Sequence, residues 1–321
     1  MSRREKHSKN KMSTTKKVLI SILTVLVLIV AGVGVYAYTI YNNVNKTSEK
    51  IHKDIKKTDK REEQVNVEKK QPFSILLMGV DHRKGDVGRA DSMILLTVNP
   101  EKKTTKMVSI PRDTRTEIVG KGKVDKLNHS YAFGGVQMTI DSVENFLDVP
   151  VDYYLEVNME GFRDIVDAVN GVDVVNDMDF TYEGTHFKKG PLHLNGELAL
   201  KYSRMRKLDP RGDFGRQMRQ RQVIEAVIKR GANVSSLGNY QDILKAIEKN
   251  VSTNLNLNEM ISIQKDYRDA ANKIDEIQIT GKGTKINGIY YLLVSDEEKN
   301  YVTAELKNNL GLNGTNTTGT K

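Results

Sequence analysis

Apolar and polar positions follow a pattern along the chain that predicts strands interleaved with helices. Nearly continuous apolar runs at 74–80 (SILLMGV) and 92–99 (SMILLTVN) are typical of strands that are buried on both faces. Three further strands are expected at 106–110, 151–159 and 276–280. Helical spacing is found at 136–147, 160–169, 196–204, 216–231, 239–250, 257–274 and 297–310. This order predicts an α/β or α+β domain in which helices cover a sheet.

The longest apolar stretch of the chain, 18–41, contains no charged residue. As a helix it would span roughly 36 Å, which is enough to cross the hydrocarbon core of a bilayer. Basic residues dominate 1–17, and three tyrosines cluster toward the other end, at Tyr36, Tyr38 and Tyr41. The positive-inside bias therefore predicts a single-pass signal-anchor at the cell membrane, with 1–17 as a cytoplasmic tail and the rest of the chain outside. A cleaved signal peptide is the alternative, although its apolar core would usually be shorter.

The segments on either side of the predicted domain are polar. Residues 42–71 are rich in lysine and are expected to form an extracellular stalk, and 311–321 is a low-complexity tail that we expect to be disordered. No shift in composition divides 72–310, so we expect one domain there. The chain has no cysteine, which excludes disulfides and a cysteine nucleophile. The formal charge of the whole chain is +9, and basic segments outside the cell favour anionic lipids or cell-wall polymers over nucleic acid as partners.

Two acids occur at neighbouring strand ends. Asp81 follows the run at 74–80 directly, and Asp91 precedes the run at 92–99, so an antiparallel pairing would bring both to the same edge of the sheet. Arg89 and Arg112 lie close to them in the sequence. Two carboxylates near arginines suit Mg²⁺, which is often held by one or two carboxylates together with phosphate oxygens. The alternative is that the acids only pair with these arginines at the surface.

The stretch RMRKLDPRGDFGRQMRQ at 204–220 carries a high density of arginine. A helix over 216–231 that begins near Asp213, whose carboxylate could cap it, would place Arg216 and Gln220 on its apolar side. The apolar stripe would consist of Val223, Ile224, Val227 and Ile228, and the solvent side of Arg221, Gln222, Glu225 and Lys229. Because a buried unpaired charge is very costly, Arg216 must meet an internal carboxylate or a bound anion. Its place near a helix N-terminus favours the anion.

Arg204 and Arg206 precede Asp209-Pro210, which ends the helix before them, and they would share a face only on an extended backbone. Other kinds of site are excluded by the sequence. It contains no Walker A motif, no GxSxG and no HExxH, and its histidines show no metal-binding spacing.

Several segments together resemble one known family. LLMGVDHR, RADSMILLTVNP, MVSIPRDTR, KLNHSYAFGG, ALKYSRMR and DPRGDFGRQMRQRQVI resemble, in order, the motifs of the LytR–CpsA–Psr family, over roughly 72–300. The resemblance is nearest to the teichoic-acid transferases of Gram-positive bacteria that act on polyisoprenyl-linked polymer and peptidoglycan. It implies a mixed central sheet flanked by helices, with an apolar pocket for a polyisoprenyl chain and a mouth for its pyrophosphate with Mg²⁺ or Mn²⁺.

The resemblance also implies roles for single residues. Asp81 and Asp91 would hold the metal. The pyrophosphate would be bound by Arg89, Arg112, Arg204, Arg206, Arg216 and Gln220. Asp91, Arg112 and Arg216 would take part in catalysis. The convergence of Arg204 with Arg206 follows from the resemblance alone.

The implied reaction is a phosphoryl transfer from a polyisoprenyl-pyrophosphate-linked glycopolymer to a peptidoglycan hydroxyl, which leaves a phosphodiester. Such chemistry depends on positioning and on neutralisation of oxygen charge, which a metal and arginines supply. Two alternatives stay open. One is a polyisoprenyl-pyrophosphate phosphatase that uses water as the acceptor, and the other is a non-catalytic regulator or receptor of the cell envelope.

Overall fold

The computed structural model describes residues 38–81, 87–232, 244 and 247–312. The chain divides into two compact units, 1–46 and 47–321, and residues 38–51 are helical. Most of the predicted anchor, 18–37, and the tail from 313 onward lie outside the described residues. Among the helices that are described, none has the length and apolar character needed to cross a membrane.

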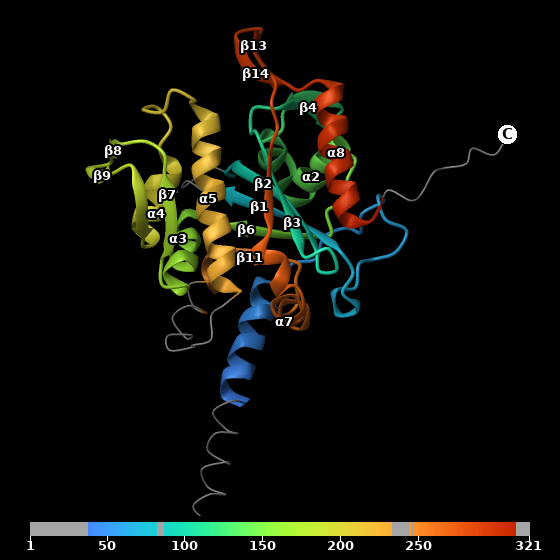
Figure 1. Cartoon of the computed structure of the whole chain (residues 1–321). Helices are drawn as coiled ribbons and strands as arrows, with labels where there is room; N and C mark the ends of the chain where they lie inside the picture. Colours follow the sequence, from blue (N-terminus) through green and yellow to red (C-terminus); the bar gives the residue numbers. More distant parts are fainter. Residues whose placement is uncertain (1–37, 82–86, 233–243, 245–246, 313–321) are drawn as a thin grey trace, which may run out of the picture. The chain divides into compact units, whose positions relative to one another are not determined.

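Six strands form the central sheet of the larger unit (Figure 1). Their order is β11 (Val251–Thr253), β6 (Tyr153–Val157), β1 (Phe73–Val80), β2 (Ala90–Asn99), β3 (Thr104–Ile110) and β12 (Ile274–Gln278). The β1–β2, β2–β3 and β6–β11 pairs are antiparallel, whereas β1–β6 and β3–β12 are parallel. The sheet is therefore mixed, as the resemblance implied, and β1 and β2 at its centre are the two apolar runs that the sequence predicted to be buried on both faces.

Helices cover both faces of this sheet. On one face, α2 (His129–Leu147) and α8 (Asp296–Leu310) pack on alternate residues of β1 and β2, such as Leu76 and Leu95. On the other face lie residues that alternate with these, and α5 (Asp213–Gly231) packs there through Ile224 and Ile228. Beyond α5 a second apolar cluster joins α3 (Met159–Ala168) and α4 (Gly196–Arg204) to a two-stranded sheet of β7 (Val172–Asn176) and β10 (Gly190–Leu194).

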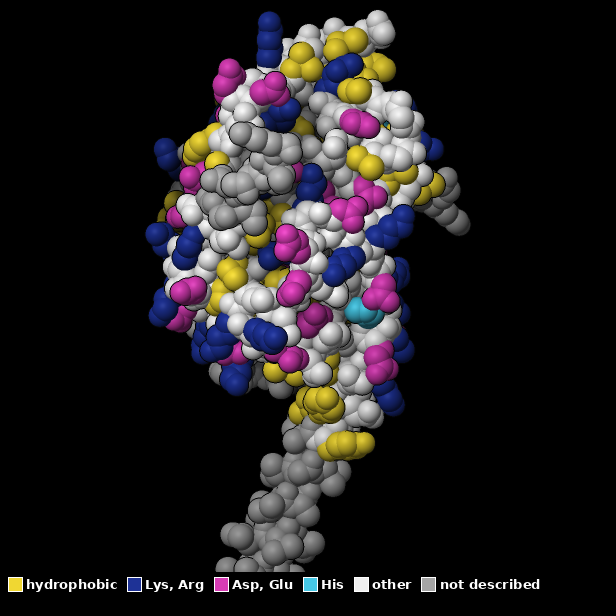
Figure 2. Space-filling view, turned by 90° about the vertical axis from the view of Figure 1, so that its right-hand side faces the viewer, with side chains coloured by type: hydrophobic (Ala, Val, Ile, Leu, Met, Phe, Trp, Pro, Cys, Tyr) yellow, Lys and Arg dark blue, Asp and Glu magenta, His cyan; other side chains and the backbone are white. Residues whose placement is uncertain are grey.

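Smaller elements complete the domain. Three hairpins are formed by β4 (Arg115–Ile118) with β5 (Lys123–Lys126), β8 (Phe180–Tyr182) with β9 (Thr185–Phe187), and β13 (Lys282–Ile286) with β14 (Ile289–Leu293). The remaining helical segments are η1 (Val67–Lys69), α7 (Leu257–Asp266) and η2 (Arg268–Asn272). On the face shown in Figure 2, acidic and basic side chains are interspersed rather than gathered by sign.

Two predicted elements differ from the observed ones, and a third falls mostly on residues that the structure does not describe. The helix expected at 136–147 begins at His129, because a kink at Gly134 and Gly135 joins two helical segments there and Gly135 adopts a positive φ that glycine tolerates. The helix expected over 257–274 is split into α7 and η2, and its last residue opens β12. Most of the helix expected at 239–250 lies outside the described residues.

The segment 42–71, predicted to be a stalk, contributes to the packing of the domain. Val65 and Val67 are buried in an apolar cluster with Phe73, Tyr153 and Tyr267. The last part of this segment is thus folded against the sheet, because its few apolar residues complete a cluster with Phe73 and Tyr153, the first residues of β1 and β6.

Candidate functional site: an apolar cavity with an arginine-lined mouth

A cavity of about 730 Å³ lies between the sheet and α5. Its floor consists of four cross-strand pairs of β1 and β2: Phe73–Val98, Ile75–Leu96, Leu77–Ile94 and Gly79–Ser92. At about 3.3 Å per residue these pairs extend over roughly 20 Å. Because side chains alternate between the two faces of a strand, every second residue of β1 and β2 faces the cavity. These residues are apolar except for the last pair, Gly79–Ser92, which lies next to Asp81 and Asp91.

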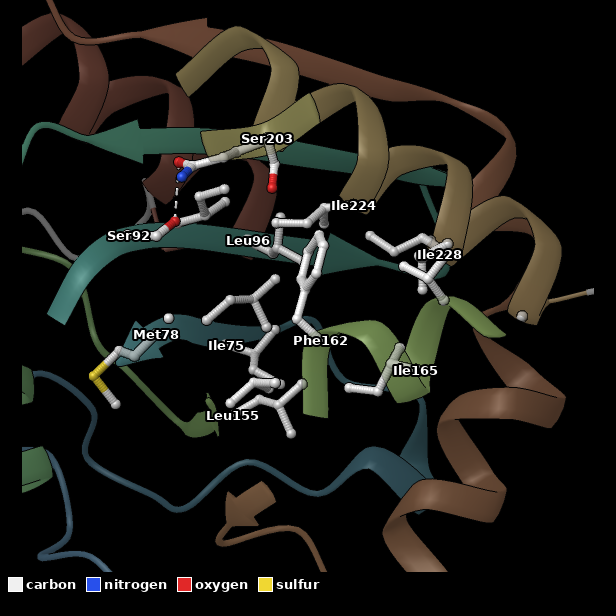
Figure 3. Close-up of a pocket in the computed structure, with 18 of the residues that line it drawn as sticks. Ile75, Met78, Ser92, Leu96, Leu155, Phe162, Ile165, Ser203, Ile224 and Ile228 are labelled. Atoms are coloured by element: carbon white, nitrogen blue, oxygen red, sulfur yellow. Dashed lines mark hydrogen bonds between the residues drawn. The ribbon is translucent and has the colours of Figure 1, made fainter. Parts of the chain in front are cut away.

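The walls of the cavity come from helices that are far apart in the sequence. Phe162 and Ile165 of α3 face Ile224 and Ile228 of α5 across the floor residue Leu96 (Figure 3). The cavity is lined further by Met260 and Ile263 of α7, by Tyr267 and by Leu155 of β6, among others. Such a long apolar cavity suits a hydrocarbon chain rather than a small polar ligand.

The end of the cavity at which β1 ends and β2 begins carries charged and polar residues, and we call this end the mouth. The mouth is lined by Asp81, Asp91, Ser92, Arg204, Arg216 and Gln220. Five of these six residues were singled out from the sequence, and the antiparallel pairing of β1 with β2 brings Asp81 and Asp91 to the same end of the sheet as expected. Ser92 was missed, although its position next to Asp91 could have suggested it.

Asp91 is held by two partners through one oxygen. Arg112 Nη1 lies 3.0 Å from Asp91 Oδ1, and Asn128 Nδ2 donates a hydrogen bond of 3.2 Å to the same oxygen. Burial lowers the pKa of Arg112, but the charges of Asp91 and Asp213 outweigh this effect and raise the pKa overall. The pairing of Asp91 with Arg112, one of the alternatives left open by the sequence, is therefore present, and it lies at the mouth rather than on an open surface.

Arg216 lies on the inward side of α5, as the helical spacing predicted. Its Nη2 is 2.8 Å from Asp213 Oδ1 and 3.4 Å from the backbone oxygen of Asp91. Its Nε is buried without a hydrogen-bond partner among the described residues, and the same holds for the Nε of Arg112. Arg112 does not itself line the cavity, but it contacts Asp91, which does. Each of the two guanidinium groups thus keeps a donor that an anion with several oxygens could use.

Asp213 connects the arginines at the mouth. It was expected to cap α5, but the N-cap is Gly212, which has a positive φ, and no side-chain cap is made. Asp213 is instead paired with Arg216, and Arg206 Nε lies 3.7 Å from its Oδ1. Burial raises the pKa of this carboxyl, but Arg216 and Gln217 more than offset the effect and lower it overall.

Of the two remaining predicted arginines, Arg204 lines the cavity and Arg89 does not. Arg204 lines the cavity and its Nη1 is 3.6 Å from Glu183 Oε1. The side chain of Arg89 is exposed and is not part of the cavity lining, although its backbone oxygen accepts a hydrogen bond of 3.0 Å from the Asp91 N–H.

The prediction that Arg221 faces solvent is wrong. Its side chain is buried, its Nε lies 2.7 Å from Glu276 Oε2 of β12, and its Nη1 donates to Ser109 of β3. Gln222, also placed on the solvent side, bonds with Tyr202 and with the backbone of Val175. A single-helix projection could not show this, because the edge of the sheet on one side and β7 on the other both cover the flanks of α5.

Two further arginines of the 204–220 stretch are structural. Arg219 is fully buried, its Nη1 lies 2.7 Å from Asp209 Oδ2, and its guanidinium stacks 5.5 Å from the ring centre of Phe180. Arg211 also pairs with Asp209, and a Cβ at Gly215 would collide with the Asp209 carboxylate. Hydrogen bonds from Arg211 and Arg219 hold the pKa of Asp209 well below its usual range. This network ties the loop after α4 to α5 and so fixes Arg206 near Arg216.

Ser92 orients Gln220 at the mouth. The Ser92 hydroxyl donates a hydrogen bond of 3.1 Å to Gln220 Oε1, which is the dashed contact in Figure 3. Because the amide oxygen is engaged, the amide nitrogen of Gln220 is the atom left to donate to a bound anion.

We expect Ser92→Ala to weaken binding of inorganic pyrophosphate, used as a probe of the mouth, by about 3- to 10-fold, since a neutral hydrogen bond contributes about 1 kcal/mol. Isothermal titration calorimetry would measure the affinity. In a Gln220→Ala background the same change should have no further effect, because its only proposed target is then absent. An undiminished effect in that background would contradict the orienting role.

The mouth offers a metal ion two carboxylates, so a bound ligand and water would have to supply the other metal ligands. Among residues outside the masked segments, no group of three or more His, Cys, Asp or Glu side chains could enclose one. Asp81 and Asp91 offer two carboxylates, and hard oxygen ligands of this kind fit Mg²⁺ when phosphate oxygens and waters complete its six positions. The residues present are thus suited to a metal that arrives with, or is completed by, a phosphate ligand.

The architecture defines an α+β protein with an apolar cavity that opens between arginines and two carboxylates. The chain belongs to the LytR_cpsA_psr family, whose model matches residues 38–308. The motif resemblance seen in the sequence is thereby confirmed.

Individual relatives are similar over most of the chain. A protein of Bacillus licheniformis named polyisoprenyl-teichoic acid–peptidoglycan teichoic acid transferase TagU is 54% identical over 300 residues, which cover 94% of this chain and 98% of the relative. The crystal structure of B. subtilis TagU is 54% identical, with a TM-score of 0.62, and the match covers 75% of this chain and 97% of that one. A structure of TagT bound to LIIa-WTA is 34% identical, with a TM-score of 0.68, and covers 80% and 97% respectively.

Proposed function

We propose that this protein is a transferase that moves an anionic glycopolymer, wall teichoic acid in the first instance, from a polyisoprenyl-pyrophosphate carrier to peptidoglycan. The observation that carries the proposal is the apolar cavity of about 730 Å³ with Arg204 and Arg216 at its mouth. A lipid chain would fill the apolar part, and the pyrophosphate would lie at the arginines. The names of the TagU relatives support teichoic acid as the substrate and peptidoglycan as the acceptor, and the TagT complex with LIIa-WTA supports the same polymer.

In the proposed reaction, a peptidoglycan hydroxyl attacks the phosphorus on the glycopolymer side of the pyrophosphate. The bond from this phosphorus to the bridging oxygen breaks, polyisoprenyl phosphate leaves with the electron pair, and the hydroxyl proton is released. A phosphodiester between polymer and wall remains. The charge that develops on the phosphate oxygens would be neutralised by Arg112 and Arg216, whose buried Nε–H groups have no partner among the described residues. No nucleotide is consumed.

Asp81 and Asp91 are proposed to hold a divalent metal, Mg²⁺ or Mn²⁺, together with the pyrophosphate. When bound, the metal would supply positive charge against the phosphate oxygens. Arg112 and Asn128 both engage Oδ1 of Asp91 and so fix the direction of this carboxylate. The remaining proposed ligands of the pyrophosphate are Arg89, Arg206 and Gln220.

We expect Asp91→Asn to lower the transfer rate by about 10²–10³-fold even in excess Mg²⁺, since a metal contributes several kcal/mol to such a transition state. Chelation of the wild-type protein should have an effect of the same size. Transfer is measured with lipid-linked polymer and peptidoglycan. Asp173→Asn is the control, because Asp173 is exposed on β7 and pairs with His193 and Arg230. Full activity of Asp91→Asn would remove the metal-site assignment.

The decisive test of the function uses the full-length chain in detergent with defined lipid-linked glycopolymer, Mg²⁺ and peptidoglycan. Polymer attached to peptidoglycan through a phosphodiester is the expected product. Release of free polymer phosphate at the same rate without peptidoglycan would instead favour the phosphatase. Tight binding of the lipid-linked polymer with neither product would favour a regulator or receptor.

The charge-free stretch 18–41 and its basic flank lead us to propose that the chain is anchored in the cell membrane with its domain outside. Protease added to intact cells stripped of their wall should then remove the part of the chain that follows residue 72. Protection of this part until the membrane is opened would contradict the proposed orientation.

A further inference from the structure

Asn128 occupies a helix start but does not act as a helix cap. It is the N-cap residue of α2, yet its side chain accepts no hydrogen bond from the first turn. The caps of α3, α4 and α7 are also asparagines, Asn158, Asn195 and Asn256, and each accepts a backbone N–H bond. A cap of this kind typically contributes about 1 kcal/mol. The backbone at those three caps is extended, whereas Asn128 has helical backbone angles (φ −66°, ψ −15°), which do not aim its side chain at the first turn. The side chain of Asn128 is therefore available for a contact with another element.

The side chain of Asn128 is turned toward Asp91 instead. Its Nδ2 donates to Asp91 Oδ1, and its own Oδ1 is buried with no hydrogen-bond partner among the described residues. An amide nitrogen can approach a carboxylate whereas an amide oxygen cannot, so the orientation is determined by Asp91. The residue as a whole is only 5% exposed. Leaving an acceptor buried and unpaired is a cost, and such costs are retained where a site depends on the geometry.

Arg112 and Asn128 approach the same oxygen of Asp91 from different elements. Arg112 follows β3, while Asn128 begins α2, and the Asn128 N–H donates to the Arg112 backbone oxygen at 3.2 Å. Both side chains therefore hold Oδ1 of Asp91, and Oδ2 is the oxygen left for the mouth. The Asp91 side chain is 35% exposed and lines the cavity, so the carboxylate is open to a ligand on that side.

We propose that Asn128 is a positioning residue that holds Asp91 in the orientation needed for transfer. The proposal rests on the proposed function and on the assignment of Asp91 to the metal. It predicts that the amide N–H, rather than the shape of the side chain or its capping ability, is what the site requires.

Two variants separate positioning from packing. Asn128→Ala removes the hydrogen bond to Asp91, whereas Asn128→Asp keeps the shape of the side chain but places a second carboxylate against Asp91. A role in packing alone predicts that Asn128→Asp works as well as the wild type and that only Asn128→Ala is impaired. The positioning role predicts that both lose transfer, with Asn128→Asp at least as slow as Asn128→Ala. Asn195→Ala and Asn195→Asp serve as matched controls at an ordinary cap.

The measurements are the kcat of transfer, the affinity for a short-chain polyisoprenyl pyrophosphate, and the affinity for Mn²⁺ by electron paramagnetic resonance. Residues that orient a metal ligand typically change metal affinity or activity by about 10- to 100-fold when removed. We expect Asn128→Ala to lose Mn²⁺ affinity and kcat in this range, with lipid affinity measured without metal unchanged. The Asn195 variants should change thermal stability only.

If the wild type fails to transfer polymer, the proposed function is wrong, and the Mn²⁺ titration of Asn128→Ala still decides the role of Asn128. Wild-type levels of both Mn²⁺ affinity and kcat in Asn128→Ala would overturn the proposal. So would an Asn128→Asp protein that transfers as fast as the wild type.

Discussion

Replacement of Arg216 by lysine should leave a folded protein that is nearly inactive. Lysine keeps the positive charge and can still pair with Asp213 one turn away, so the helix start should be preserved. It loses the planar fork and the Nε–H donor that is buried without a partner. By analogy with the loss of one donor to a developing oxyanion, we expect the rate of transfer to fall by about 10²–10³-fold.

The control for this variant is Arg230→Lys on the same helix. Arg230 lies in the last turn of α5, where it pairs with the exposed Asp173 and with the backbone oxygen of Asn170, away from the mouth. Exposed pairs of this kind contribute little, so its activity should remain near wild type. Arg221→Lys would not serve, because Arg221 is buried against Glu276. Equal activity of the Arg216 and Arg230 variants would show that Arg216 does not contact the reacting phosphate.

Replacement of Arg219 by alanine should produce the largest loss of stability among the arginines of this stretch. The change leaves Asp209, whose side chain is fully buried, with Arg211 as its remaining cationic partner. It also removes the guanidinium from the faces of Phe180 and Tyr202. Breaking a buried pair by removing one partner typically costs 3–5 kcal/mol, and because Arg211 remains we expect a loss of about 3 kcal/mol in the free energy of unfolding.

Denaturant unfolding followed by circular dichroism would measure this loss, with Arg230→Ala as the control at an exposed position. The Arg230 variant should unfold at nearly the wild-type denaturant concentration. Because the same network positions the loop that carries Arg206, residual transfer by Arg219→Ala should also fall at temperatures where the protein is still folded. A loss well under 1 kcal/mol would mean that Arg211 alone satisfies Asp209.

Much of the site could be read from local patterns because its parts lie on regular elements. The period of two in 74–80 and 92–99 determines which side chains of β1 and β2 face the cavity, and the antiparallel connection brings Asp81 and Asp91 together. The period of 3.6 in 216–231 places Arg216 and Gln220 above Ile224. Each of these inferences needs only the geometry of one element or of one pair of adjacent strands.

The sequence does not reveal contacts between residues that are far apart along the chain. The solvent side assigned to α5 was wrong for Arg221, since Glu276 of the edge strand β12 lies more than fifty positions further along the chain. The sequence predicts that Asp213 caps α5, whereas in the structure its carboxylate lies close to Arg206 and Arg216. Helix projection describes one element in isolation, and the partner of a buried charge is supplied by whichever element packs there.

The sequence by itself determined the family, the central strands, the carboxylates at their ends and the inward arginine of α5, because these depend on short-range periodicity and on motif order. Only the tertiary structure decided which arginines support the fold and which line the mouth. Arg216 and Arg219 are three residues apart on one helix and chemically identical, yet Arg219 is closed off by Asp209 and two aromatic rings while Arg216 keeps a donor at an open cavity. The physical reason is that the sequence gives the position of each arginine along a helix, whereas the carboxylate or ring that pairs with it comes from another element that packs against that helix.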